Sequence, residues 1–248
     1  MAKDFWGESP IAIAHRGGDA AGEEQENTLK AFQAAWGLGY RYGETDVLLT
    51  ADGRVAAIHG SRNWLQTQFN GHPPRRALQR MTLKEIQSHT AEGVKITCLD
   101  ELLNGLPDMK FLIDPKTDQV VLPLAKLLKN LGAIDRVCVG SFSYERVVHF
   151  QKIIKQPVRT SFIIGRGVKV VNKGRAMLKT GRLKHIEAVQ LHHSLISKEM
   201  VDLVHSHGFK ALVWTPNSPL SIKNAIRCGA DGIISDQVEL LKTVINSK

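Results

Sequence analysis

The sequence predicts an α/β fold in which alternating strands and helices close into a (β/α)8 barrel, also called a TIM barrel. Apolar runs of strand length alternate with segments of helical spacing along almost the whole chain of 248 residues. Such alternation is typical of a parallel sheet whose strands are joined by crossover helices. A barrel of this kind takes roughly 250 residues as one domain, so we expect a single domain over residues 1–248.

An open doubly wound sheet is the main alternative to the barrel. A dinucleotide-binding sheet would carry the pattern G-x-G-x-x-G directly after its first strand. The first apolar run here is followed only by Gly17-Gly18. The closed barrel is therefore favoured.

The spacing of apolar residues places the individual elements. Nine runs have the length of strands, at residues 11–14, 42–48, 55–58, 111–113, 137–139, 158–164, 188–191, 211–214 and 232–234. Six segments have helical spacing, at residues 28–38, 120–131, 143–153, 198–207, 219–228 and 238–245. Asn27 precedes the first helix and is its candidate N-cap, whereas Gly132 ends the second.

Residues 60–97 interrupt the alternation. The stretch is polar and contains Pro73-Pro74 and Arg75-Arg76. We expect a small insertion after the second-strand region, between that strand and its helix. One short helix is expected within it, near residues 82–89.

The composition is that of a globular protein, with 43% apolar and 23% charged residues. Cys98, Cys138 and Cys228 lie far apart in the sequence, so neither a disulfide framework nor a cysteine-based zinc site is indicated. No apolar run approaches the roughly 20 residues of a membrane span, and the first ten residues lack the apolar stretch of a signal peptide. We therefore expect a cytoplasmic protein. The sequence carries no signal of its oligomeric state.

The net charge of +9 is concentrated in one segment, which we call the basic segment. Residues 146–186 contain eleven lysines and arginines and no acid, so the rest of the chain has a net charge of −2. One interpretation is a solvated helix face that keeps the protein soluble. The other is a surface that attracts an anionic diester or rests transiently on an anionic membrane. No RNA- or DNA-binding motif accompanies the segment, so nucleic acid is not expected as a partner.

Polar residues stand at nearly every predicted strand end. In a (β/α)8 barrel the chemistry lies at the C-terminal ends of the strands. The residues at these positions are His15 and Arg16, Glu44 and Asp46, His59, Asp114 and Lys116, Ser141, Gln190 and His192, Trp214 and Asn217, and Asp236. Because they recur in barrel order, they predict one shared site.

Three of these residues, Glu44, Asp46 and Asp114, are carboxylates. Glu44 and Asp46 are two residues apart on a strand, so their side chains point the same way. Asp114 follows an apolar run, where an acid is costly to bury unless it is paired or bound to a metal. An oxygen-rich set without cysteine suits a hard cation such as Mg²⁺ or Ca²⁺.

The remaining groups complete a set suited to cleaving a phosphoester. His15 and His59 would exchange protons near neutral pH. Arg16 and Lys116 would hold an anion, and the arginine fork matches two phosphate oxygens. A metal and cations that stabilise the phosphate charge, together with two proton carriers, are what this reaction requires.

Short motifs in the same order resemble those of the glycerophosphodiester phosphodiesterase family. They are Ile13-Ala14-His15-Arg16-Gly17-Gly18, Glu26-Asn27-Thr28, Glu44-Thr45-Asp46-Val47, Thr50-Ala51-Asp52-Gly53, Ile113-Asp114-Pro115-Lys116, Gly140-Ser141-Phe142, Val213-Trp214-Thr215-Pro216-Asn217 and residues 229–236. The resemblance spans nearly the whole chain. It implies a TIM barrel that hydrolyses a glycerophosphodiester to glycerol 3-phosphate and an alcohol.

The resemblance also implies roles for the candidate residues. His15 and His59 would be the acid/base pair, with His15 expected as the base and His59 as the acid. The metal, Mg²⁺ or Ca²⁺, would be bound by Glu44, Asp46 and Asp114. Arg16, Lys116 and Trp214 would bind the substrate and its phosphate. The insertion at about residues 60–97 would cover one side of the site.

Three positions depart from the family pattern. Asp114 stands where many relatives have glutamate, and Gln25 replaces a proline. Gly60 follows His59 where the family usually has aspartate. If that aspartate orients the histidine, its loss would weaken proton transfer. Two alternatives therefore stay open: a lysophospholipase-D-like activity on lipid, and a catalytically impaired protein that binds its ligand.

Overall fold

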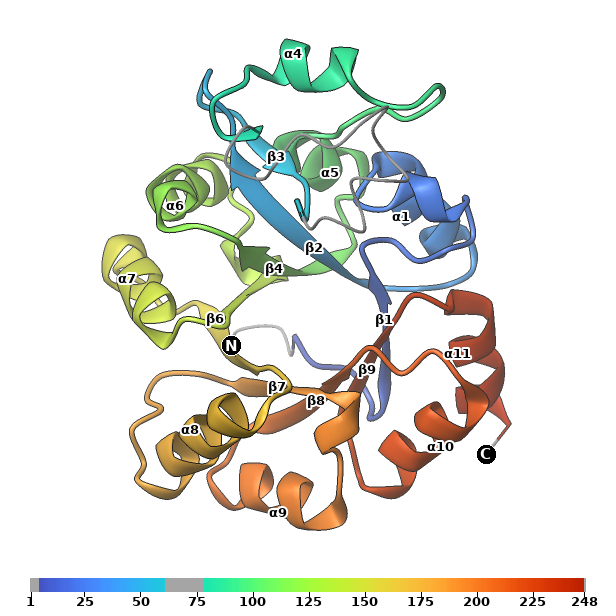
Figure 1. Cartoon of the computed structure of the whole chain (residues 1–248), viewed down its shortest axis with the longest axis vertical. Coiled ribbons are helices and arrows are strands. Elements are labelled where there is room, and N and C mark those ends of the chain that lie inside the picture. The colour runs from blue at the N-terminus through green and yellow to red at the C-terminus, as the bar shows by residue number, and fades with distance from the viewer. Residues whose placement is uncertain (1–4, 61–77, 248) are drawn as a thin grey trace.

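Eight parallel strands form a closed barrel in the computed structural model, which describes residues 5–60 and 78–247 (Figure 1). Each strand pairs with its two neighbours, and β1 pairs with both β2 and β9, which closes the ring. The strands of the ring are β1 (Ile11–His15), β2 (Tyr42–Leu49), β4 (Lys110–Pro115), β5 (Val137–Ser141), β6 (Arg159–Ile164), β7 (Ala188–His192), β8 (Lys210–Trp214) and β9 (Gly232–Ser235). The predicted (β/α)8 barrel is confirmed.

Helices follow the strands and surround the barrel (Figure 1). They are α1 (Leu29–Gly37), α5 (Leu99–Gly105), α6 (Val121–Asn130), α7 (Tyr144–Ile154), α8 (Val168–Lys179), α9 (Lys198–Ser206), α10 (Pro219–Arg227) and α11 (Val238–Asn246). Short 3-10 turns also occur at η1 (Glu23–Gln25), η2 (Asp118–Val120), η3 (Ile134–Arg136) and η4 (His193–Leu195). The six helices predicted with bounds are found within one residue at each end.

The prediction that Asn27 caps α1 is wrong. Thr28 is the N-cap, and its side chain accepts a hydrogen bond from the backbone N–H of Ala31. Asn27 instead has a positive φ of 59° and is buried. Its side-chain oxygen accepts from the Thr45 hydroxyl at 2.8 Å and from the Asp46 N–H at 3.3 Å. Asn27 therefore ties the start of α1 to the polar end of β2.

β3 (Val55–Ala57), the strand predicted at 55–58, precedes the insertion, and the insertion contributes α4 (Leu83–Ser88). β3 lies outside the ring and pairs antiparallel with β2. α4 confirms the predicted short helix; it begins at the capping box of Thr82 and buries Ile86 against the β2–β3 edge. Residues 61–77, with Pro73-Pro74 and Arg75-Arg76, lie outside the described residues.

The barrel interior is apolar at the N-terminal end of the strands and polar at the C-terminal end. At the apolar end, Phe5 packs edge-on against Tyr42, whose hydroxyl donates to the Phe5 carbonyl at 2.5 Å. Nearer the other end, a Cβ on Gly140 would lie 2.4 Å from the Ser161 hydroxyl and 2.7 Å from the Gln190 amide nitrogen. Glycine is therefore required there to make room for two polar side chains of neighbouring strands.

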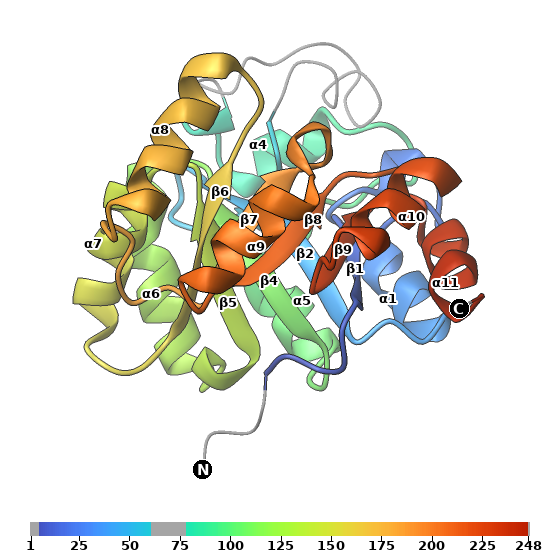
Figure 2. The same ribbon diagram turned by 90° about the horizontal axis from the view of Figure 1, so that it is seen from below.

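Seen from the side, the strands run toward one end of the molecule, and the N-terminal end of α8 extends furthest in that direction among the helices on its side (Figure 2). In the described part of the chain, no helix is both long enough and apolar enough to cross a membrane.

Candidate active site

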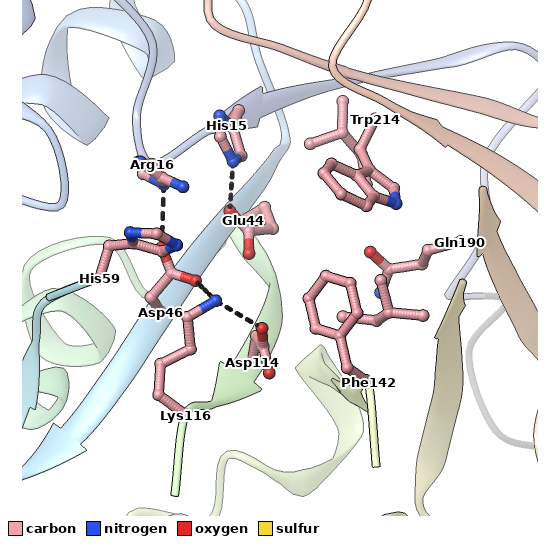
Figure 3. A pocket seen from close by; sticks show the side chains of 12 residues that line it. His15, Arg16, Glu44, Asp46, His59, Asp114, Lys116, Phe142, Gln190 and Trp214 are labelled. Carbon is pink, nitrogen blue, oxygen red and sulfur yellow. Dashed lines mark hydrogen bonds and ion pairs between the residues drawn. The ribbon is translucent and has the colours of Figure 1, made fainter. Parts of the chain in front are cut away.

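A pocket of about 60 Å³ lies at the C-terminal end of the barrel (Figure 3). All eight residues to which the sequence assigned a role line it. Of the other strand-end residues, Gln190 lines it too, whereas Ser141, His192, Asn217 and Asp236 do not. Its walls consist of His15, Arg16, Glu44, Asp46, His59, Asp114, Lys116, Phe142, Ile163, Gln190, Trp214 and Ile234. Four strands and three connecting segments thus bring the predicted residues to one place.

The register of the barrel explains why the carboxylates meet. Asp46 on β2 is the direct partner of Asp114 on β4, so both side chains leave the same face of the sheet. Glu44 precedes Asp46 by two residues and therefore shares that face. All three are buried.

Two cations hold Asp46. The Lys116 ammonium lies 2.5 Å from Asp46 Oδ1 and 2.7 Å from Asp114 Oδ2, and Arg16 Nε lies 2.9 Å from Asp46 Oδ2. Burial alone would raise the pKa of Asp46, but Lys116 and Arg16 together lower it well below its ordinary value. Arg16 also donates to Glu26 at 3.0 Å. Asp46 is therefore ionised, and both cations are oriented toward the pocket.

Glu44 has no such partner. Its Oε2 atom is buried without a hydrogen bond, and the nearest cationic group, His15 Nε2, is 3.7 Å away. Burial, followed by the charge of Asp46, raises the pKa of Glu44 to about 7. Asp114 likewise has one buried oxygen, Oδ1, without a hydrogen bond, and burial raises its pKa too. A buried acid without partners is costly, so these oxygens have capacity for a cation.

The donor atoms present are of the type that binds a hard divalent metal. The set is all oxygen, and three of its atoms, Glu44 Oε2, Asp46 Oδ2 and Asp114 Oδ1, are buried without hydrogen bonds. Within the described ranges, however, no three histidine, cysteine or acidic side chains form a ready-made metal cluster. The Lys116 ammonium lies between Asp46 and Asp114, so a metal bound by all three carboxylates would displace it.

His15 is oriented by a residue to which the sequence assigned no role. Its Nδ1 lies 2.5 Å from Oδ1 of Asp236, and its Nε2 faces Glu44. Burial and Arg16 disfavour the charged ring, but Asp236 and Glu44 outweigh them and raise the pKa of His15. Asn217 donates to Asp236 and accepts from its backbone N–H at 3.1 Å. The sequence offered a signal, because both residues stand at strand ends.

His59 lies beside Arg16 and Asp46 (Figure 3). The backbone N–H of Ile58 donates to the Asp46 carbonyl at 3.0 Å, which holds the end of β3 over the site. Burial, followed by Arg16 and Lys116, lowers the pKa of His59 to about 3 despite the opposing charge of Asp46. His59 is therefore neutral near pH 7.

Aromatic side chains form the opposite wall. Phe142 and Trp214 pack edge to face with ring centroids 5.6 Å apart, and the Lys116 ammonium lies 5.8 Å from the Phe142 ring centroid. Trp214 Nε1 is buried without a hydrogen bond. Sequence analysis missed Phe142 as a lining residue. One half of the pocket is thus charged and the other aromatic, which suits a phosphate joined to an organic group.

Comparisons with known proteins point to one family. The model of the glycerophosphoryl diester phosphodiesterase family matches residues 15–240. The chain is 30% identical to a "Probable glycerophosphodiester phosphodiesterase 2" of Mycobacterium tuberculosis, covering 95% of this chain and 90% of that protein. It is 24% identical to a lysophospholipase D of Mus musculus, covering 95% of this chain and 86% of the relative.

Solved structures share the fold. A glycerophosphodiester phosphodiesterase from Thermotoga maritima superposes with a TM-score of 0.76 at 20% identity, covering 96% of this chain and 99% of its own. A phosphodiesterase from Oleispira antarctica, solved with the product sn-glycerol-3-phosphate, superposes with a TM-score of 0.77 at 18% identity, covering 99% of both chains.

Proposed function

Because the chain belongs to the glycerophosphodiester phosphodiesterase family and is therefore a phosphoric diester hydrolase, we propose that it releases glycerol 3-phosphate and an alcohol from a glycerophosphodiester with the help of a divalent metal and two histidines. One observation carries the proposal: three carboxylates, two cations and two histidines line a single small pocket. The product found in the Oleispira antarctica structure supports a small glycerophosphoryl ligand for this pocket as well.

Glu44, Asp46 and Asp114 would hold the metal, Mg²⁺ or Ca²⁺. When bound there, it would stabilise the negative charge that builds up on the phosphate oxygens. Arg16 and Lys116 line the pocket, so both would bind the phosphate of the substrate, Lys116 once it is displaced from Asp46 and Asp114 by the metal. Trp214 and Phe142 would contact the organic part on the opposite wall.

His15 would act as the general base. With Nδ1–H donated to Asp236, the neutral ring presents an unprotonated Nε2 to the pocket, where it would take the proton of the attacking oxygen. His59 would give a proton to the leaving alcohol. An anionic phosphate next to His59 would offset Arg16 and Lys116 and so raise the pKa of its ring toward the range in which it carries a proton.

Release of glycerol 3-phosphate from glycerophosphocholine tests the proposal. The purified protein is assayed as prepared, after EDTA treatment, and after Mg²⁺ or Ca²⁺ is restored, with His15→Ala as the control. We expect EDTA to abolish turnover and one of the metals to restore it in the wild type alone. Absence of turnover with every metal and headgroup, together with binding of glycerol 3-phosphate, would support the impaired binding protein that Gly60 suggests.

A lysophospholipase-D-like activity is the second candidate. It is favoured by the lysophospholipase D of Mus musculus among the relatives and by the half-exposed Phe142 at the pocket. Choline release from lysophosphatidylcholine and from glycerophosphocholine, measured side by side, separates the two activities. A higher kcat/KM for the lipid would make it the principal substrate.

A further inference from the structure

Exposed apolar side chains gather at one end of the barrel. Among the side chains that the structure describes, the large apolar residues that are exposed are Leu122 (45%), Phe142 (48%), Val170 (47%) and Leu220 (80%). All four stand directly after a strand of the ring or in the first turn of the helix that follows it, after β4, β5, β6 and β8. We call them the entrance rim, because the pocket opens at the same end.

The rim is continuous with the pocket at Phe142. Phe142 lines the pocket beside Trp214. On its other side, a Cβ built on Gly165 would lie 3.2 Å from the Phe142 ring and 3.9 Å from the Val170 side chain. Phe142 and Val170 therefore lie next to each other, and the apolar surface leads into the site.

Positive charge accompanies the apolar side chains on one side of the rim. Arg166 and Lys169, in the loop after β6 and the first turn of α8, are exposed, as is Lys223 on α10. The basic segment that contains the first two has no acid over 41 residues, from 146 to 186. α8 extends beyond the barrel at this end (Figure 2). Arg166 and Lys169 therefore stand at a protruding part of the rim.

Acids also lie at this end of the barrel. Asp118 is paired with Arg146 at 2.8 Å, and Glu145 accepts from the Ser143 hydroxyl at 3.0 Å. Glu145 also interacts electrostatically with Lys173 of α8, and Glu199 is exposed in the first turn of α9, which follows α8. The exposed cations on this side, Arg166, Lys169, Lys173 and Lys223, outnumber these two acids, so an anionic surface would attract the α8 and α10 side of the molecule.

We propose that the entrance rim docks on an anionic lipid bilayer, with Phe142, Val170 and Leu220 in the interface and Arg166, Lys169 and Lys223 against the headgroups. Exposed apolar residues next to lysine and arginine are the features by which proteins bind a charged lipid surface. The N-terminal end of α8, which extends beyond the barrel, can reach a flat bilayer. The proposal concerns docking and goes beyond the hydrolysis of a soluble diester.

Vesicle sedimentation with the full chain tests the docking. Vesicles of pure phosphatidylcholine are compared with vesicles containing phosphatidylglycerol, at low and high salt. We expect binding to the anionic vesicles alone, weakened by salt. Lys169→Gln/Lys223→Gln should weaken it by roughly 25-fold, because each cation near such a surface contributes about five-fold in affinity.

A matched pair of substitutions provides the control. Lys152→Gln/Lys179→Gln removes the same charge from the exposed last turns of α7 and α8, at the opposite end of the barrel, and should change binding less than three-fold, by about the effect of a distant charge. Val170→Ser/Leu220→Ser should weaken binding at unchanged net charge. None of these variants should alter turnover of soluble glycerophosphocholine, so docking and catalysis are scored separately.

Three results would overturn the proposal. They are equal binding to neutral vesicles, equal losses in both lysine pairs, and no binding by a folded wild type. A concentration-dependent dimer that Leu220→Ser abolishes would assign the rim to a second copy of this chain instead. Melting temperatures of all variants verify that each is folded.

Discussion

One ring nitrogen of His15 faces the pocket, and the other faces Asp236. This contact fixes the tautomer, since the Nδ1 proton is held by the carboxylate. Asn217 in turn holds Asp236. Three residues from three strand ends thus determine the orientation of one imidazole.

Asp236→Asn tests this orientation. The amide has the same shape but favours the wrong tautomer of His15, so we expect kcat to fall by about 10²–10⁴-fold with KM changed little. Glu239→Gln, which removes an exposed acid three residues away, is the control and should leave kcat unchanged. A parallel loss of thermal stability in Asp236→Asn, with kcat intact, would show a purely structural role.

Leaving groups of different acidity separate the two histidines. A nitrophenolate leaves without help from an acid, whereas choline does not. We therefore expect His59→Ala to retain far more of its activity toward a nitrophenyl diester than toward glycerophosphocholine, and His15→Ala to lose both by about 10²–10⁴-fold. The reverse pattern would exchange the roles of base and acid.

Most elements could be predicted because their apolar spacing is local information. No bounds were predicted for α5, because contacts that stabilise this helix come from far along the chain. It has seven residues, and the Arg136 guanidinium, some 30 residues further along, donates to the carbonyls of Leu103, Leu106 and Met109 at 2.5, 3.2 and 3.2 Å. Long-range contacts of this kind leave no periodic signal.

The sequence identified which residues form the site, but not how their side chains contact one another. Motifs at strand ends named all eight residues expected in the pocket. The Lys116 ammonium between Asp46 and Asp114, and the carboxylate behind His15, depend on register across the barrel, which the sequence does not display. Asn27 shows the same limit, since either it or Thr28 satisfies the pattern of an N-cap.

Asp231, just before β9, shows how an element is held in place. Its carboxylate accepts from the Ala211 N–H at 2.8 Å, from His205 at 2.7 Å and from Lys210 at 3.1 Å. Burial would raise the pKa of Asp231, but these hydrogen bonds lower it below the ordinary value. One side chain thus connects β8, β9 and α9.

We expect Asp231→Asn to lower the free energy of unfolding at pH 7 by about 1–3 kcal/mol. Because the folded-state pKa is depressed, the contribution is complete above the unfolded pKa of about 3.9 and is lost as the pH falls through the folded value. Urea unfolding at pH 7 and near pH 3 measures this. A difference that persists undiminished at low pH would contradict it.

The control for this experiment is Asp202→Asn. Asp202 pairs with Lys198 at 2.7 Å, but both side chains are exposed. Exposed pairs contribute little, so we expect a change within about 0.5 kcal/mol at either pH.

At the scale of the whole molecule, stability and activity make opposite demands at Glu44. Its buried oxygen without a hydrogen bond disfavours folding unless a cation is bound. We expect Glu44→Gln to raise the melting temperature of the EDTA-treated protein or leave it unchanged, and to abolish turnover.

The same variant reports on the metal. Ligands that bind only the folded state stabilise it, by about 2.7 kcal/mol at a concentration 100 times the Kd. Mg²⁺ or Ca²⁺ should therefore raise the melting temperature of the wild type but not of Glu44→Gln. An identical metal-induced shift in both proteins would place the cation elsewhere.

The packed apolar end of the barrel, formed by Phe5 and Tyr42, has a consequence for how substrate enters and products leave. Because packed side chains close that end, substrate and products use the same opening of the pocket. Glycerol 3-phosphate must leave before the next diester can enter, so it is expected to be a competitive inhibitor of its own formation. If that opening also faces a lipid surface, the polar product would have to leave along the plane of the surface. Dissociation of the protein from the surface would then limit the rate of turnover.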